Sequence, residues 1–133
     1  MLLSDVGGVA LRVHIIDFGM ATLSRYCKAA VRGKRSYQAP EMHEEAAYDV
    51  FLADVFALGV TLFIMAAQDY PWAATRADKC ELFSHVCAHG LPALLRIRKL
   101  RKGDGMLLAD AFSPAFLQLL EGLLAPDPEA RLT

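Results

Sequence analysis

The alternation of apolar and polar positions at the start of the chain predicts a β-hairpin. Residues 1–3 form a short apolar run, and residues 4–8 contain Ser, Asp and two glycines, which favour a turn. Residues 9–16 then alternate with the period of a half-buried strand. The apolar residues on one side of this second strand are Val9, Leu11, Val13 and Ile15.

Residues 50–67 form a long apolar segment that predicts a helix. A membrane span is one alternative, but crossing a bilayer takes about 20 consecutive apolar residues. Asp54 lies inside the segment, and its uncharged part, residues 55–67, is only 13 residues long. Because an acid is costly in a bilayer, the pattern favours a buried helix, and no membrane partner is expected.

A second helix is predicted over residues 77–89, with Leu82, Val86 and His89 on one stripe and Gly90 as its end. Two basic stretches lie on either side of these helices, at residues 20–40 and 96–102. We expect both to be loops facing solvent, the first of them mobile. Docking of an acidic partner is the alternative for the second stretch.

The clearest helix start is at Ser113, a capping residue type, followed by Pro114, which suits a first turn. The apolar residues that follow at helical spacing are Phe116, Leu119, Leu120, Leu123 and Leu124. The complete pattern predicts a mainly α fold of the α+β type. A β-hairpin at the front is followed by helices packed around the central apolar helix.

Hydrophobic residues make up 55% of the 133 residues, which indicates either a large core or apolar surface meant for a missing partner. The net charge of −1 gives no reason to expect nucleic acid as a partner. The start of the chain lacks the features of a signal peptide. We therefore expect a cytoplasmic, intracellular protein whose cysteines, Cys27, Cys80 and Cys87, are reduced.

Cys80, His85, Cys87 and His89 lie close together in the sequence. A metal cluster is one reading of this group, but the spacing matches no standard zinc pattern, and a helix would spread the four over different faces. Ordinary core and surface roles are the favoured interpretation.

Three motifs occur in order: Asp-Phe-Gly at residues 17–19, Ala-Pro-Glu at 39–41, and Asp-Val-Phe-Ala-Leu-Gly-Val at 54–60. Pro-Asp-Pro-Glu-Ala-Arg-Leu-Thr closes the chain, and the first two motifs together bound a segment of 25 residues. In this order and spacing, the chain resembles the C-terminal lobe of a eukaryotic protein kinase over essentially its whole length. Gly-Lys-Arg-Ser-Tyr-Gln-Ala-Pro-Glu resembles the serine/threonine type, and residues 54–72 are similar to calcium/calmodulin-dependent kinases.

The resemblance implies roles on the nucleotide side of the site. Asp17 would bind the magnesium ion that bridges the phosphates of ATP. Phe18 would pack inward and set the state of the segment that follows, and Gly19 would give the backbone its freedom to turn. Leu2 would lie on the apolar floor beneath adenine. A large residue after the motif, here Met20, goes in the family with serine acceptors.

The resemblance also implies structural roles. Glu41 would form a buried ion pair with Arg131, tying the activation segment to the base of the lobe. Asp54 would accept hydrogen bonds from the catalytic-loop backbone, and its place near a helix start also fits an N-cap. Tyr37 would pack under the substrate-docking segment, which includes Gly33.

Three hydroxyl residues are candidate phosphorylation sites whose phosphate would pair with the basic loop at residues 25–35: Thr22, Ser24 and Ser36. Ordinary solvated cations are the alternative interpretation of that loop. Lys34 stands where the family has Thr or Ser, whose hydroxyl contacts the catalytic aspartate. Acceptor specificity therefore differs from the usual pattern even in the parent kinase.

The resemblance implies further parts that these residues do not contain: a glycine-rich loop, a phosphate-binding lysine and the His-Arg-Asp catalytic loop. We expect residues 1–133 to be a partial kinase domain, from the strand after the catalytic loop to just before the last helix. The N-lobe would be the missing intramolecular partner. ATP, magnesium and a protein substrate would belong to the parent kinase, and this chain alone is expected to be inactive.

Three hypotheses remain open. The chain is part of an active serine/threonine kinase, a non-catalytic kinase-like binding or decoy module, or a membrane-associated protein built on the apolar helix. The second is less favoured, because a free-standing lobe would expose Leu2, Phe18 and their neighbours to water.

Overall fold

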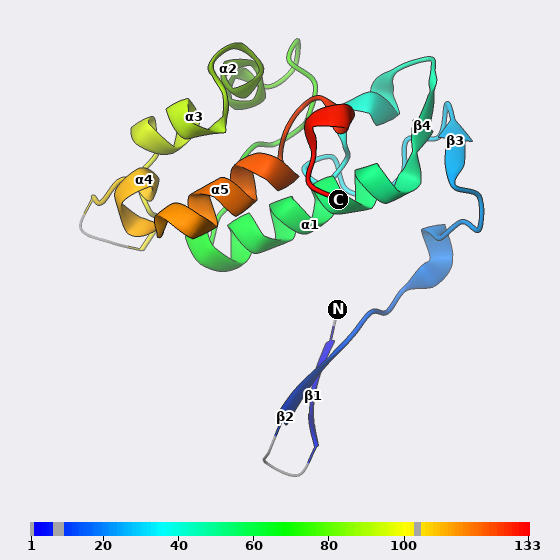
Figure 1. Ribbon diagram of the computed structural model, residues 1–133, viewed down its shortest axis with the longest axis horizontal. Coiled ribbons are helices and arrows are strands. Elements are labelled where there is room, and N and C mark those ends of the chain that lie inside the picture. Colours follow the sequence, from blue (N-terminus) through cyan, green and yellow to red (C-terminus); the bar gives the residue numbers. More distant parts are fainter. Residues whose placement is uncertain (1, 7–9, 103–104) are drawn as a thin grey trace.

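The computed structural model describes residues 2–6, 10–102 and 105–133. It consists of a helical body and a hairpin arm that projects from it (Figure 1). The arm pairs β1 (Leu2–Val6) with β2 (Ala10–His14) in antiparallel register, with Leu2 opposite His14. The predicted hairpin is confirmed, although its first strand is longer than expected. Met1, the glycines at 7–8 and Val9 lie outside the described residues.

Between the arm and the body, the chain forms the 3-10 turn η1 (Phe18–Met20) and the strand β3 (Tyr26–Lys28). β3 pairs with β4 (Ala47–Asp49) in a second small antiparallel sheet, and the turn η2 (Pro40–His43) lies between them in sequence. The interpretation of residues 20–40 as a loop without regular structure is therefore wrong at β3. Strand pairing of Tyr26 with Asp49 holds it in place, a partner that no local pattern reveals.

The central helix α1 (Val50–Ala67) has the predicted bounds. By length and composition it is also the one described helix that is apolar enough to cross a membrane, with a third of its residues buried inside the fold. Phe56, Val60 and Phe63 are fully buried and form the middle of the core. This face of α1 is the core of the fold, whereas the opposite face, with Phe51, Leu58 and Met65, is exposed.

The other helices cover α1 on one side (Figure 1). They are α2 (Glu81–His89), α3 (Leu91–Ile97), α4 (Leu108–Ala111), α5 (Pro114–Leu123) and the 3-10 turn η3 (Pro128–Ala130). As predicted, the side chain of Ser113 accepts a hydrogen bond from the backbone N–H of Phe116 at the start of α5. The mainly helical fold with one hairpin in front is confirmed.

Helix α2 corrects part of the predicted stripe. Phe83 and Val86 point into the core, where Phe83 packs edge-on against Trp72 with ring centroids 5.0 Å apart. Leu82 and His89 are exposed instead. The helix begins at Glu81, and its buried residues, Phe83 and Val86, are three positions apart on one face, which leaves Leu82 and His89 on other faces.

Candidate functional site

The Asp-Phe-Gly turn lies at the junction of the arm and the body. Asp17 adopts the left-handed backbone conformation, with φ of 65°, and its side chain makes no capping hydrogen bond to η1. Phe18 is 68% exposed, so the expectation that it packs inward is wrong in this structure. No described segment lies over this turn to receive the ring. β1 contains Leu2, but the position of the Leu2 side chain lies outside what the structure describes.

The fit of this turn to a magnesium ion depends on how many oxygen ligands converge there. No group of three or more His, Cys, Asp or Glu side chains is arranged for a metal ion in the described part of the chain. A magnesium ion needs near-octahedral oxygen coordination shared with phosphates and water. Asp17 alone does not make a site that fits the ion.

The three candidate phosphorylation sites differ in their exposure to solvent. The Thr22 hydroxyl accepts a hydrogen bond from the backbone N–H of Ser24 (3.1 Å), and both residues are exposed. The hydroxyl of Ser36 is buried and donates to the carbonyl of Ala73 at 3.2 Å. The indole N–H of Trp72 also donates to the carbonyl of Ser36. Only Thr22 and Ser24 are presented to solvent in this conformation.

The segment that we expect to dock a substrate is held by polar contacts at Gly33 and Lys34. Gly33 has a φ of 84°, which favours glycine, and its carbonyl accepts a hydrogen bond from the Gln38 side chain (2.8 Å). The amine of Lys34 donates to the hydroxyl of Tyr70 at 2.6 Å and lies 4.1 Å from the centre of that ring. Tyr37 packs edge-on against the same ring, with centroids 6.0 Å apart.

The surroundings of the two tyrosines shift their pKa values in opposite directions. The hydrogen bond from Lys34 lowers the pKa of Tyr70, because it stabilises the phenolate. Burial raises the pKa of Tyr37. The amine of Lys34 is therefore directed to Tyr70 and not into open solvent, where a Thr or Ser hydroxyl would stand in the family pattern.

The predicted ion pair between Glu41 and Arg131 is present and buried. The two Nη atoms of Arg131 donate to the two carboxylate oxygens of Glu41, with Nη2 and Oε2 2.7 Å apart. The guanidinium also lies 4.9 Å from the ring centre of Phe56. Its remaining donor capacity is used by three backbone carbonyls, those of Leu52, Ala125 and Pro126. The Ala-Pro-Glu motif is thereby joined to the C-terminal end of the fold.

The N-cap of α1 is Asp49, not Asp54. The Asp49 carboxylate accepts hydrogen bonds from the backbone N–H of Phe51 and from Nε of Arg25, both at 2.9 Å. Asp54 is the fifth residue of the helix, too far along to cap it. Sequence reasoning overlooked Asp49, although Asp is a preferred N-cap residue and stands directly before the apolar run that begins at residue 50.

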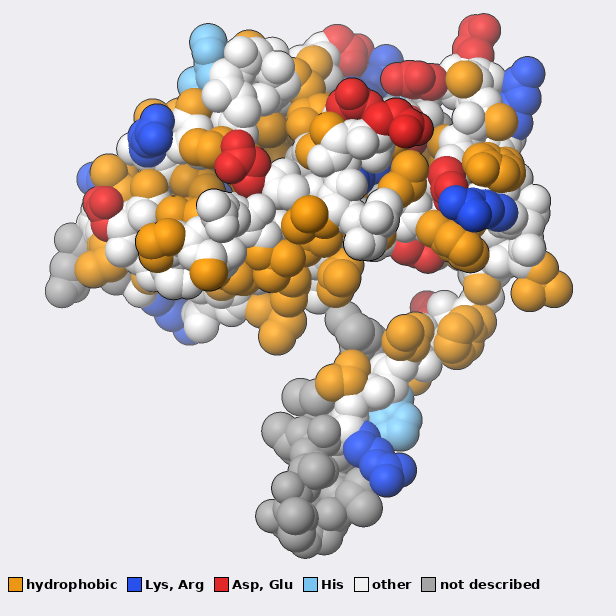
Figure 2. Space-filling view, in the orientation of Figure 1, with side chains coloured by type: hydrophobic (Ala, Val, Ile, Leu, Met, Phe, Trp, Pro, Cys, Tyr) orange, Lys and Arg blue, Asp and Glu red, His pale blue; other side chains and the backbone are white. Residues whose placement is uncertain are grey.

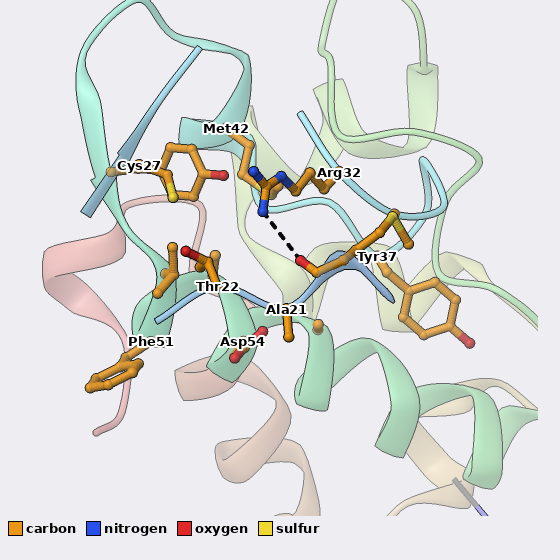
Figure 3. Close-up of a pocket in the computed structure, with 14 residues that line it drawn as sticks. Ala21, Thr22, Cys27, Arg32, Tyr37, Met42, Phe51 and Asp54 are labelled. Carbon is orange, nitrogen blue, oxygen red and sulfur yellow. Dashed lines mark hydrogen bonds between the residues drawn. The ribbon is translucent and has the colours of Figure 1, made fainter. Parts of the chain in front are cut away.

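Asp54 instead lies at the edge of an open pocket of about 320 Å³ between α1 and the activation segment. Met42, Thr22 and Phe51 line the same pocket (Figure 3). Arg32 also lines it and donates from Nη1 to the carbonyl of Met20 at 3.3 Å. Apolar surroundings raise the pKa of the Asp54 carboxyl by desolvation, and among the described residues it has no hydrogen-bond or ion-pair partner.

Arg98 is a structural residue that the sequence pattern did not identify. The basic run at residues 96–102 predicts a solvated loop, but Nη1 of Arg98 donates to the carbonyls of Tyr70 and Pro71 at 2.7 Å, and Nη2 pairs with Asp69 at 2.8 Å. Arg98 fixes the turn that carries Tyr70 beneath the docking segment. One cation among five in a basic run gives no local signal of such a partner.

Comparison with known proteins gives a consistent result. The sequence matches the protein kinase domain family over residues 2–133. It is 28% identical to serine/threonine-protein kinase 36 of Pongo abelii over 136 aligned positions, which cover all of this chain and 9% of that protein. It is also 28% identical to CBL-interacting protein kinase 20 of Oryza sativa subsp. japonica, covering 26% of that protein.

One half of the chain is 42% identical to the serine/threonine-protein kinase SAPK4 of the same rice subspecies. The aligned residues cover 19% of that protein. The chain thus spans about a quarter or less of the length of these relatives. Motif order, the buried Glu41–Arg131 pair and the family match agree. The chain belongs to the protein kinase domain family and is related to serine/threonine kinases.

Proposed function

We propose that residues 1–133 form the substrate-side part of a serine/threonine kinase and do not transfer phosphate by themselves. The observation that carries this proposal is the buried Glu41–Arg131 pair, which connects the end of the activation segment to the base of the helical body. Around it, Gly33 and Lys34 are held against Gln38 and Tyr70. This arrangement supplies a rigid docking surface, which is the contribution of this region to positioning a protein substrate.

Catalysis requires groups that these residues do not contain. Ahead of Asp17 the chain carries one other carboxylate, Asp5, one cation among Lys and Arg, Arg12, and no lysine. Phosphoryl transfer depends on a base, a phosphate-binding lysine and two magnesium ligands, and each such effect contributes several kcal/mol, of the order of 3 kcal/mol. ATP, magnesium and a Ser/Thr protein substrate are accordingly proposed for the parent kinase, of calcium/calmodulin-dependent type.

Phosphorylation of the activation segment is proposed at Thr22 or Ser24, since both hydroxyls are exposed. Arg32 lines the same pocket as Thr22 and is a candidate partner for the added phosphate. Ser36 would have to leave its buried position first. A phosphomimetic Thr22→Glu variant with unchanged thermal stability would argue against such pairing.

A non-catalytic binding module is the second candidate, and Lys34 is the observation that favours it. Its amine is engaged with Tyr70 at the position where the family contacts the catalytic aspartate and acceptor. Such a lobe would bind a protein without phosphorylating it.

A chimeric kinase distinguishes the two candidates. The N-lobe and catalytic loop of a related serine/threonine kinase are joined to residues 2–133, and transfer from ATP to Ser and Thr peptides is measured. We expect transfer that Asp17→Asn abolishes and Lys34→Thr increases. A chimera that folds, by circular dichroism and thermal melting, yet remains inactive with Lys34→Thr would contradict the kinase proposal and favour the binding module.

A further inference from the structure

Two histidines of α2 lie against each other across one helical turn. His85 and His89 are four residues apart, and residues at this spacing share a face of a helix. Their ring centroids are 4.7 Å apart, with the ring planes inclined by 51°. Figure 2 shows histidine side chains, in pale blue, on the surface over α2. The pair belongs neither to the docking segment nor to the pocket at Asp54.

The two cysteines near this pair in sequence do not join it. Cys80 is buried at the N-cap of α2, and Cys87 is exposed. Cys87 stands two residues from each histidine, about 200° around the helix from both. No group of three or more His, Cys, Asp or Glu side chains in the described part of the chain could hold a metal ion. The helix thus separates the thiols from the imidazoles and leaves the two imidazoles together.

One nitrogen of this pair has no partner within the protein. Nε2 of His85 is buried and makes no hydrogen bond, and it is the one buried side-chain nitrogen or oxygen of this kind among the described residues. Each ring nitrogen of an imidazole donates a hydrogen bond, accepts one or binds a metal ion. A buried polar atom without a protein partner therefore points to a ligand that the chain does not itself supply.

We propose that His85 and His89 bind a divalent transition-metal ion, each through one ring nitrogen, with water at the remaining positions. Two histidines at this spacing on a helix form half of a well-known zinc-binding pattern. Zinc takes imidazole nitrogens at about 2.0–2.1 Å in tetrahedral geometry, so the two nitrogens lie about 3.4 Å apart. Rings whose centroids are 4.7 Å apart reach that separation by side-chain rotation. Imidazole suits Zn²⁺, Ni²⁺ and Cu²⁺, whereas Mg²⁺ and Ca²⁺ prefer oxygen ligands.

The sequence around the pair indicates a stabilising ion and not a catalytic one. In the hydrolytic version of this pattern, a glutamate that acts as general base follows the first histidine. Here Val86 stands at that place and is buried in the core. An ion shared by residues one turn apart links the last turn of α2, which ends at Gly90. Only the helical chain presents both ligands together, so binding should stabilise the folded protein.

The test is isothermal titration calorimetry of the 133-residue protein with Zn²⁺ at pH 7.5. The background carries Cys27→Ser and Cys87→Ser, which remove the two thiols that are not buried. We expect one ion per chain with a micromolar dissociation constant, tighter binding of Cu²⁺, and no binding of Mg²⁺. His89→Gln removes one of two ligands and should raise the dissociation constant at least about tenfold. The matched control, His43→Gln, alters a histidine outside α2 and should leave it unchanged.

Two further measurements identify the ligands without relying on affinity. Electron paramagnetic resonance of the Cu²⁺-loaded protein should show coupling to two imidazole nitrogens, and His89→Gln should show one. Zn²⁺ should raise the thermal midpoint of the wild-type protein and leave that of His89→Gln unchanged. Both effects should disappear near pH 5, because protons compete with the metal ion for the ring nitrogens.

Three results would overturn the proposal. The first is Zn²⁺ binding weaker than about 1 mM by a protein that retains its helical circular dichroism. The second is a dissociation constant that His89→Gln leaves unchanged or that His43→Gln raises equally. The third is a Cu²⁺ spectrum with one imidazole nitrogen in the wild-type protein, which would reduce the site to a single surface histidine.

Discussion

His43 lies half-buried at the end of η2, with its Nε2 atom 3.2 Å from the hydroxyl oxygen of Thr75. Burial, and then the positive charge of Arg76, lower the pKa of His43 below its ordinary value of 6.5. The unfolded chain therefore binds a proton at this residue more readily than the folded chain does. The stability associated with neutral His43 is fully present above pH 6.5 and is lost as the pH falls toward the folded-state pKa.

We predict that the free energy of unfolding, measured by urea denaturation, decreases from about pH 7.5 to about pH 5.5. In His43→Gln this decrease should be smaller, because the proton-binding group is gone. An equal decrease in the variant would assign the pH dependence to other groups. The carboxyls of Asp49 and Asp78, whose pKa values are lowered by hydrogen bonds, lose their charge only at more acidic pH.

The Glu41–Arg131 pair allows a prediction about buried charge. Arg131→Ala leaves the Glu41 carboxylate buried without a cation, and we expect the free energy of unfolding to fall by about 3–5 kcal/mol. Arg76→Ala removes an exposed pair with Asp78 and serves as the control, with an expected change of about 1 kcal/mol or less. Equal losses in the two variants, measured by urea denaturation, would show that burial of the first pair has no energetic consequence.

At the scale of elements, the contact between α1 and α5 depends on Gly59. A Cβ atom at this position would lie 2.8 Å from Cδ2 of Leu124 and 2.9 Å from Cβ of Leu123, both in the buried interface. We predict that Gly59→Ala destabilises the protein by about 1–3 kcal/mol through overpacking.

Gly122→Ala in α5 is the matched control for this substitution. The added methyl group would lie 2.5 Å from both Cγ and Cδ1 of Leu132, but that side chain is 48% exposed and can turn into solvent. The gain in helix propensity, about 1 kcal/mol, should offset that contact and leave the thermal midpoint unchanged or higher. If Gly122→Ala destabilises the protein and Gly59→Ala does not, the explanation by overpacking between α1 and α5 is contradicted.

The elements that sequence predicted well are those with strong local signals. α1 is a continuous apolar segment, and α5 begins with a capping Ser and a Pro, so their positions follow from propensity and periodicity alone. β3 depends on its pairing with the strand that ends at Asp49, and Arg98 depends on its ion pair with Asp69. Both partners are distant in sequence, and the residues next to β3 and Arg98 show only an excess of basic side chains. The Glu41–Arg131 pair was predicted across 90 positions only because a family motif identified both ends.

The exposure of Phe18 was not predictable in this way. The family motif identifies the residue, but the direction of its side chain depends on what covers the turn. Within the described residues nothing does, and the ring is exposed as expected for an uncovered lobe.

At the scale of the whole molecule, apolar side chains are exposed on both the arm and the body. Val13 and Ile15 near the arm, and Phe51, Leu58 and Met65 on α1, are between 48% and 71% exposed. The core is complete on one side of α1 and open on the other. The open side adjoins the pocket at Asp54, whose unpaired carboxylate requires a hydrogen-bond donor when it is covered.

We propose that this fold provides the substrate-docking part of a kinase domain and does not transfer phosphate by itself. The most direct test is a phosphoryl-transfer assay with radiolabelled ATP, magnesium, and mixed Ser and Thr peptides, using the purified 133-residue protein. We predict no incorporation above the enzyme-free blank, and none that changes with Asp17→Asn. Incorporation by the wild-type protein that disappears in Asp17→Asn would contradict the account.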